Sequence, residues 1–192
     1  MDVEESKELI AKIKDRARKN FSKGFNCAEC VLEAVFEHFD TDLPKDALKL
    51  ATGFGGGVGL FGDSCGAITG AVMAVGAVHG RSSLPEGDDR KAVMKESAQQ
   101  LYGNPGTYRI FNQIPNWAKE KYGHTLCRDI AHKWLDNWLC REHGLHCREL
   151  ITDITEFSVT LMLKNREEIA SKPFGDNVEN LKDNVTACDI KG

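Results

Sequence analysis

Residues 53–79 read GFGGGVGLFGDSCGAITGAVMAVGAVH, a glycine-rich stretch followed by an apolar one. The glycines of residues 53–62 predict a loop, because glycine adopts backbone conformations that other residues avoid. From Cys65 to His79 the sequence is almost entirely small and apolar, which predicts a helix buried on all sides. Its glycines and alanines would let neighbouring backbones approach closely. The stretch therefore predicts a central helix preceded by a glycine-rich loop.

Apolar residues recur at spacings of three and four along most of the chain, the pattern of amphipathic helices. We therefore expect an all-α bundle of about seven or eight helices, since no segment alternates like a strand. The expected helices span residues 3–22, 27–39, 65–79, 91–101, 106–122, 126–142 and 147–169, with a short one between Pro44 and Gly53. Gly144 is expected to separate the last two long helices.

Length and composition exclude several classes of function. The chain has 192 residues, 41% hydrophobic and 28% charged, which is typical of a globular domain with its own core. Its formal net charge of −4 gives no support for nucleic-acid binding. The longest apolar stretch is too short for a membrane span, and the acidic start lacks the layout of a signal peptide. We therefore expect a cytoplasmic protein without nucleic-acid binding or membrane insertion.

The seven cysteines are the most informative residues. In a reducing compartment they are more often ligands, redox groups or core residues than a disulfide framework. Four are expected in the first turn of separate helices, namely Cys27, Cys65, Cys127 and Cys147. A helix start supplies free N–H groups and partial positive charge, which favour a thiolate. Packing would explain one such cysteine, but four at equivalent positions predict a four-thiolate redox or metal site at one end of the bundle.

The remaining cysteines and the nearby glycines have other predicted roles. Cys30, Cys140 and Cys188 are expected to lie outside the site, although Cys30 forms a Cys-x-x-Cys motif with Cys27. The glycines expected to bring backbone N–H groups to the site are Gly55, Gly56, Gly57, Gly66 and Gly70. His146 could replace a cysteine as a ligand, although exposed loop histidines are commoner.

These motifs resemble a known family. The chain contains Phe25-Asn26-Cys27-Ala28, then the Gly-Phe-Gly-Gly-Gly run of residues 53–57, then Cys65-Gly66-Ala67-x-x-Gly70, then later single cysteines. This order is similar to that of the C_GCAxxG_C_C family of redox-active proteins, over residues 20–165. The resemblance implies four functional cysteines, which fall on Cys27, Cys65, Cys127 and Cys147.

The family is also similar to the iron–sulfur part of split-Soret cytochromes. The resemblance therefore implies an iron–sulfur cluster, a redox partner protein and, by analogy, a homodimer. Those cytochromes add c-type haem, which needs Cys-x-x-Cys-His, whereas here Val31 follows Cys30, so no haem is expected. We expect residues 1–170 to form a four-cysteine helical redox domain for electron transfer or redox sensing, with residues 171–192 as a C-terminal extension.

Two other functions fit the same cysteines. Four thiolates suit a structural zinc ion, although their spacings are long compared with the usual short knuckles. Low-pKa thiolates at helix starts also suit a thiol–disulfide oxidoreductase that uses Cys27 with Cys30 or Cys65, although no thioredoxin-like strand pattern is present. None of these interpretations assigns a catalytic residue, and residues 81–122 receive no predicted role.

Overall fold

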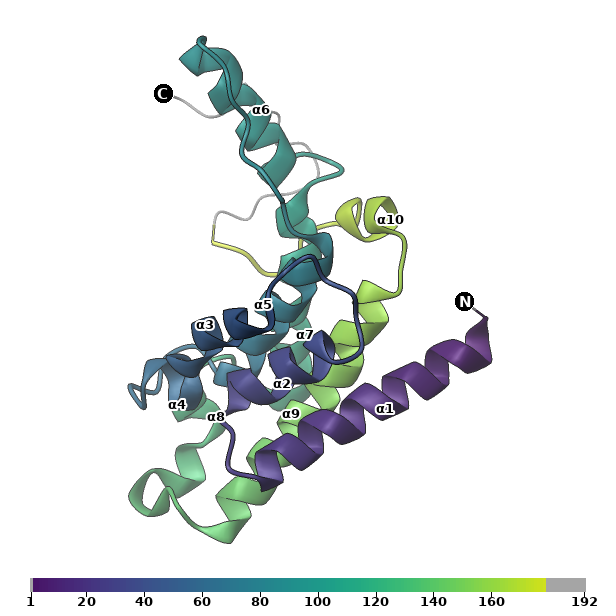
Figure 1. The fold of residues 1–192 in the computed structure, drawn as a ribbon. Helices are drawn as coiled ribbons and strands as arrows, with labels where there is room; N and C mark the ends of the chain where they lie inside the picture. Colours follow the sequence, from purple (N-terminus) through teal and green to yellow (C-terminus); the bar gives the residue numbers. More distant parts are fainter. Residues whose placement is uncertain (1, 179–192) are drawn as a thin grey trace.

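The computed structural model describes residues 2–178, and within them it contains helices and loops but no strand (Figure 1). The longer helices are α1 (Val3–Ser22), α2 (Cys27–Phe36), α5 (Gly66–His79), α6 (Arg90–Tyr102), α7 (Thr107–Tyr122) and α9 (Arg141–Met162). The shorter ones are η1 (Lys45–Leu48), α3 (Lys49–Thr52), α4 (Gly55–Val58), α8 (Cys127–Ile130), η2 (His132–Asn137) and α10 (Arg166–Ala170). The predicted all-α class is confirmed. No described helix is both long and apolar enough to cross a membrane.

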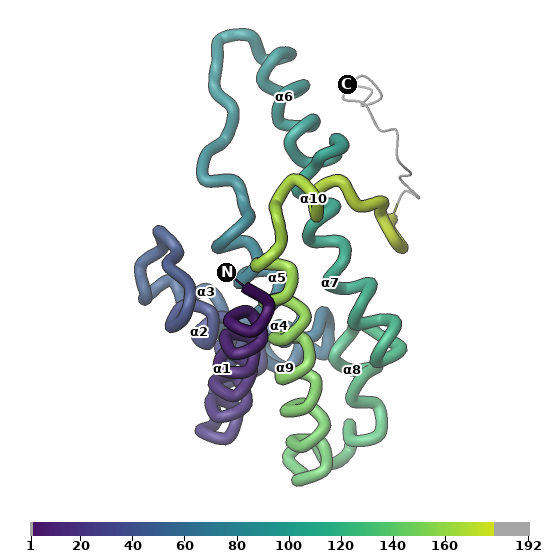
Figure 2. The backbone as a smooth tube through the Cα atoms, turned by 90° about the vertical axis from the view of Figure 1, so that its right-hand side faces the viewer, coloured from purple at the N-terminus to yellow at the C-terminus, as the bar shows by residue number. Residues whose placement is uncertain are grey.

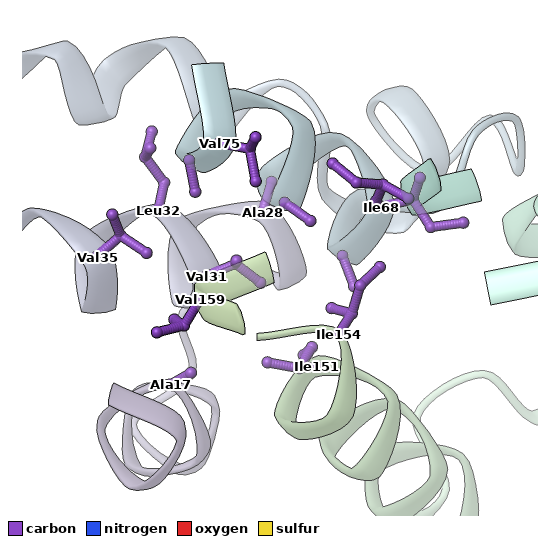
Figure 3. Close-up of a cluster of buried hydrophobic side chains, with 14 of the residues drawn as sticks. Ala17, Ala28, Val31, Leu32, Val35, Ile68, Val75, Ile151, Ile154 and Val159 are labelled. Carbon is purple, nitrogen blue, oxygen red and sulfur yellow. The ribbon is translucent and has the colours of Figure 1, made fainter. Parts of the chain in front are cut away.

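The core lies where α1, α2, α5 and α9 pack together, with α7 against α5 and α9. Figure 3 shows buried side chains from all four helices meeting there, among them Ala17, Val31, Val75 and Ile154. Helix α5 approaches α2 closely because Gly70 has no side chain: a Cβ there would lie 2.7 Å from the carbonyl oxygen of Ala28. The small residues of α5 thus place it centrally, as the sequence predicts.

Residues 80–103 form an arm that consists of a polar loop and α6. Figures 1 and 2 show α6 standing away from the bundle, on the opposite side from α8. Its contact with the body is chiefly with α7, where the rings of Tyr102 and Tyr108 meet edge to face at 5.1 Å. Two large apolar side chains of the arm, Leu84 and Met94, are exposed. The region without a predicted role therefore divides into this arm and the packed helix α7.

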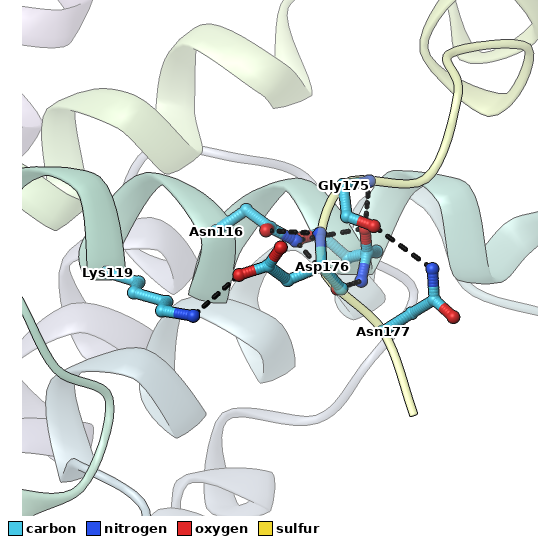
Figure 4. Close-up of polar contacts among 6 residues, drawn as sticks. Asn116, Lys119, Gly175, Asp176 and Asn177 are labelled. Carbon is cyan, nitrogen blue, oxygen red and sulfur yellow. Dashed lines mark hydrogen bonds and ion pairs between the residues drawn. The ribbon is translucent and has the colours of Figure 1, made fainter. Parts of the chain in front are cut away.

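The first part of the C-terminal extension is attached to α7 (Figure 4). The backbone N–H of Asp176 donates to Oδ1 of Asn116 at 2.8 Å, and the Lys119 ammonium lies 2.6 Å from the Asp176 carboxylate. The guanidinium of Arg109 lies over the Phe174 ring at 4.5 Å. These contacts hold residues 174–176 against the bundle. Cys188, expected to lie outside the site, falls outside the described residues.

The predicted helix over residues 126–142 and the break at Gly144 are wrong. The chain forms α8 and the 3-10 helix η2 there, and α9 begins at Arg141 with Cys140 as its N-cap. The Cys140 sulfur accepts a hydrogen bond from the His143 backbone N–H at 3.4 Å. A glycine inside a helix costs only about 1 kcal/mol, and the packing of α9 against α1 and α5 outweighs that cost. Gly144 therefore lies within α9.

Candidate functional site

Cys27 is the first residue of α2, and Asn26 fixes it there. Oδ1 of Asn26 accepts hydrogen bonds from the N–H groups of Ala28 and Glu29, at 2.9 and 3.0 Å. The Glu29 carboxylate accepts in return from the Asn26 N–H at 3.1 Å, completing a capping box. The Asn26 amide also donates to the carbonyl of Thr52, just before the glycine-rich loop. The capping box and this contact together set Cys27 beside that loop.

Cys65 and Cys127 are brought together by two short antiparallel segments. The Cys65 N–H donates to the carbonyl of Thr125 at 3.0 Å, and the Cys127 N–H donates to the carbonyl of Asp63 at 2.7 Å. An isolated β-bridge pairs the intervening residues, Ser64 and Leu126. Cys65 is the N-cap of α5, and Cys127 is the first residue of α8. Two helix starts therefore meet at this link.

The glycine-rich loop makes a left-handed turn next to these cysteines. The five residues 56–60 all have positive φ, including Val58 at 61° and Leu60 at 67°. Left-handed backbone costs about 1–2 kcal/mol at a non-glycine residue, so these two residues store strain. A Cβ on Gly57 would lie 2.7 Å from Cβ of Cys127. One on Gly66 would lie 3.1 Å from Cβ of Cys27. Only glycine allows the backbone this close to the cysteines.

The thiols of Cys27 and Cys147 form a hydrogen-bonded pair that carries the negative charge on Cys27. The hydrogen bond from Cys147 lowers the pKa of Cys27, against the opposing effect of burial, and the backbone N–H of Gly56 lowers it further. The same hydrogen bond raises the pKa of Cys147, as do burial and the charges of Cys27, Cys65 and Cys127. Of the two thiols, Cys27 is therefore the one that ionises at lower pH, and Cys147 holds its proton to higher pH.

Cys65 and Cys127 interact with this pair. Burial, and then the Cys27 charge, raise the pKa of Cys127 to about 11. The same two effects raise the pKa of Cys65 to about 12, although the N–H groups of Ala67 and Ile68 at the start of α5 oppose them. A thiolate at Cys27 is thus felt by all three other thiols. The four cysteines form one electrostatically connected group.

A histidine and two tryptophans complete the surroundings of Cys147. Nε2 of His143 lies 3.2 Å from the Cys147 sulfur, and Nδ1 lies 2.6 Å from the carbonyl oxygen of Trp138. A carbonyl oxygen only accepts, so Nδ1 carries a hydrogen. The rings of Trp134 and Trp138 lie 5.6 and 4.2 Å from His143. The sequence reveals this contact only if His143 and Cys147, four residues apart, are assigned to one helix.

The remaining predicted residues lie as follows. The prediction that Cys147 opens a helix is wrong. Cys147 lies in the second turn of α9, and Cys140 occupies the helix start instead. Cys30 is fully buried, its thiol lies 3.5 Å from the carbonyl of Phe25, and burial raises its pKa. Nε2 of His146 is buried without a hydrogen-bond partner among the described residues. A Cβ on Gly55 would lie 2.9 Å from Cβ of Asn26, whereas Gly70 faces α2.

The arrangement differs from a preformed site for one ion. Within residues 2–178, no three His, Cys, Asp or Glu side chains are placed to hold a single metal ion together. The group as it stands has one cysteine, Cys27, with a lowered pKa beside three cysteines with raised pKa values, and helix starts are directed at it.

Comparison with known proteins supports a general redox role for the protein. The family model described as “Putative redox-active protein (C_GCAxxG_C_C)” matches residues 25–161, well over half of the chain. The fold and the four connected thiols define a helical thiol protein with a redox role. The chain belongs to the C_GCAxxG_C_C family. No curated protein and no solved structure matches it.

Proposed function

We propose that Cys27, Cys65, Cys127 and Cys147 bind an iron–sulfur cluster, and that the protein acts in electron transfer or redox sensing. The observation that supports this most is the gathering of four electrostatically connected thiols beside a glycine-lined turn. Thiolates are the usual ligands of iron–sulfur clusters, and four of them are the usual number. The four sulfur donors, with backbone N–H groups directed at Cys27 and Cys65, suit such a group.

The spacing of the cysteines favours a cluster over zinc. Structural zinc sites usually draw on pairs of cysteines separated by about two to four residues, whereas Cys27, Cys65, Cys127 and Cys147 lie at least 20 positions apart in the sequence. Both groups would require Cys65, Cys127 and Cys147 to lose their protons, and the positive ends of α2, α5 and α8 would offset the added charge.

The polypeptide would tune such a cluster through its backbone. When bound, the cluster would take up and release an electron. The N–H of Gly56 is directed at the Cys27 sulfur, and those of Ala67 and Ile68 at the Cys65 sulfur. Hydrogen bonds to ligand sulfurs stabilise negative charge and raise the reduction potential. Burial of Cys65 and Cys127 would keep water away from the sulfurs.

Anaerobic purification with iron and sulfide analysis tests the proposal. We expect stoichiometric iron and sulfide with a visible absorption band in the wild type, and loss of both in Cys127→Ser and Cys147→Ser. Cys140→Ser is the matched control, because serine is also a good N-cap for α9 and Cys140 lies outside the connected group. Iron-free protein after anaerobic purification would refute the cluster. Stoichiometric zinc without iron would favour the zinc alternative.

A second candidate is thiol–disulfide exchange by Cys27 and Cys147. Their hydrogen bond and the lowered pKa of Cys27 favour it, and they replace the pairings with Cys30 or Cys65 suggested by the sequence. In this reaction the two thiols lose two electrons and two protons and form one disulfide. A disulfide-bearing partner gains them and becomes two thiols.

Variants of Cys65 and Cys127 distinguish the two candidate functions. Cys65→Ser and Cys127→Ser should abolish a four-thiolate cluster, but they should leave thiol–disulfide activity of Cys27 and Cys147 intact. Insulin reduction and iron content, measured on the same preparations, distinguish the outcomes.

We also propose a cytoplasmic homodimer that exchanges electrons with a partner protein. The six cysteines of the described residues are all unpaired, which fits a reducing compartment. Helix α5 is apolar throughout, yet Val72 and Met73 are only half buried, which leaves an apolar face for a second copy. Light scattering of the purified protein tests the dimer.

A further inference from the structure

A cavity of about 550 Å³ lies at the base of the arm, where the arm joins the body. Four chain segments line it: residues 80–83 after α5, Gln99 and Gln100 of α6, residues 105–107 at the start of α7, and Arg166 of α10. Figures 1 and 2 show α6 and α10 approaching each other here. Among residues 2–178, no acidic side chain lines the cavity. It is separate from the cysteines and the function proposed for them.

Two arginines from different elements converge on this cavity. Nη1 of Arg81 donates to Oγ of Ser97 at 3.2 Å and to the Gln100 side chain at 3.4 Å. Nε of Arg166 donates to the carbonyl of His79 at 3.2 Å, and Nη2 donates to Oγ1 of Thr107 at 3.3 Å. These partners are neutral, and neither guanidinium pairs with a carboxylate among the described residues. Each keeps N–H donors that no other described residue accepts from.

Neighbouring groups add to the positive potential. The 16-residue helix α7 begins at the cavity, and its N-cap, Gly106, has no side chain to accept the first N–H groups. The Thr107 hydroxyl donates to the carbonyl of Gln100 at 2.9 Å, which ties α7 to the arm. The hydroxyls of Ser82 and Ser83 supply further donors. Donors, positive charge and a helix start therefore surround one space.

We propose that this cavity binds the phosphate group of a small phosphorylated molecule. Guanidinium groups match phosphate oxygens with paired hydrogen bonds, and an uncapped helix start favours the same anion. The volume lies in the usual range for small-molecule sites. A ligand here bridges Arg81 on the arm and Arg166 on the body, so binding fixes the arm against the bundle.

Calorimetric titration of the full chain with inorganic pyrophosphate tests the proposal. We expect one molecule bound per chain, with the affinity lowered about ten-fold or more in Arg81→Gln and in Arg166→Gln, since each variant loses charge-assisted hydrogen bonds. Arg90→Gln is the matched control, because Arg90 lies on the same arm, is exposed and does not line the cavity. Thermal unfolding checks that each variant folds. If Arg166→Gln does not fold, the pyrophosphate affinity of Arg81→Gln alone tests the proposal.

Three results would overturn the proposal. The first is no pyrophosphate binding by the wild-type chain. The second is an equal loss of affinity in Arg90→Gln, which would indicate general charge attraction. The third is tighter binding of citrate than of pyrophosphate, because the site would then prefer carboxylates.

Discussion

At the scale of single residues, Cys27 differs from the other cysteines in its protonation. The hydrogen bond from Cys147 and the N–H of Gly56 outweigh burial and lower its pKa, whereas the pKa values of Cys65, Cys127 and Cys147 are raised. Only the thiolate is a nucleophile. Cys27 should therefore be the reactive member of the group in the metal-free protein.

Alkylation of the metal-free protein measures this difference. The rate at Cys27 should rise through a midpoint below the ordinary thiol pKa of about 8.5. Cys147→Ala removes the largest cause of the lowered pKa, so the midpoint should move to higher pH. Cys140→Ser should leave it unchanged. Peptide mass spectrometry across a pH series gives the midpoint, and an unmoved midpoint in Cys147→Ala would contradict the assigned hydrogen bond.

Gly57 and Gly59 separate backbone strain from steric contact. Both have positive φ, at 71° and 61°, but a Cβ at Gly57 would lie 2.5 Å from the carbonyl oxygen of Asp63 and 2.7 Å from Cβ of Cys127, whereas one at Gly59 meets nothing within 4 Å. Gly59→Ala should cost only the left-handed strain, about 1–2 kcal/mol. Gly57→Ala should cost clearly more and should also perturb Cys127. Urea unfolding of both variants checks this, and equal losses would show that the cysteine contact is unimportant.

At the scale of elements, α9 shows how a helix start can be misjudged. Gly144 lies inside the helix, with nothing within 4 Å of its absent Cβ. Gly144→Ala should therefore raise the free energy of unfolding by about 0.5–1 kcal/mol, because alanine restricts the unfolded chain and suits a helix. Urea or thermal unfolding measures the change. A destabilised variant would mean that the helix breaks at Gly144.

Capping residues and apolar spacing in the sequence predicted most helices. The features that they did not predict depend on packing in the folded protein. Asn26 with Glu29 forms its capping box within four residues, so the start of α2 could be read from the sequence. The start of α9 depends on Cys140, a weak capping residue, and on burial of His143 against Trp134 and Trp138 of the preceding segment. The meeting of Cys65 with Cys127 depends on a link between segments far apart in the sequence, which periodicity does not report.

At the scale of the whole molecule, the arm is the part least supported by other elements. Most residues of the loop 81–89 are exposed, and α6 packs chiefly on α7. Limited trypsin digestion of the native protein should therefore cut first at Arg81 or Arg90 within residues 2–178, while α1, α2, α5 and α9 stay intact. Mass spectrometry over time identifies the first cuts. Earlier cleavage within α1 or α9 would contradict this order of stability.

The link between Ser64 and Leu126 also constrains when the site can be assembled. Joining segments about sixty residues apart costs roughly 3–4 kcal/mol of loop-closure entropy, so this contact requires the rest of the bundle to compensate for it. A ribosome that has made only α1 to α7 has not yet synthesised Cys127 or Cys147. Any cofactor that needs all four thiols can then be bound only after Cys147 has been synthesised.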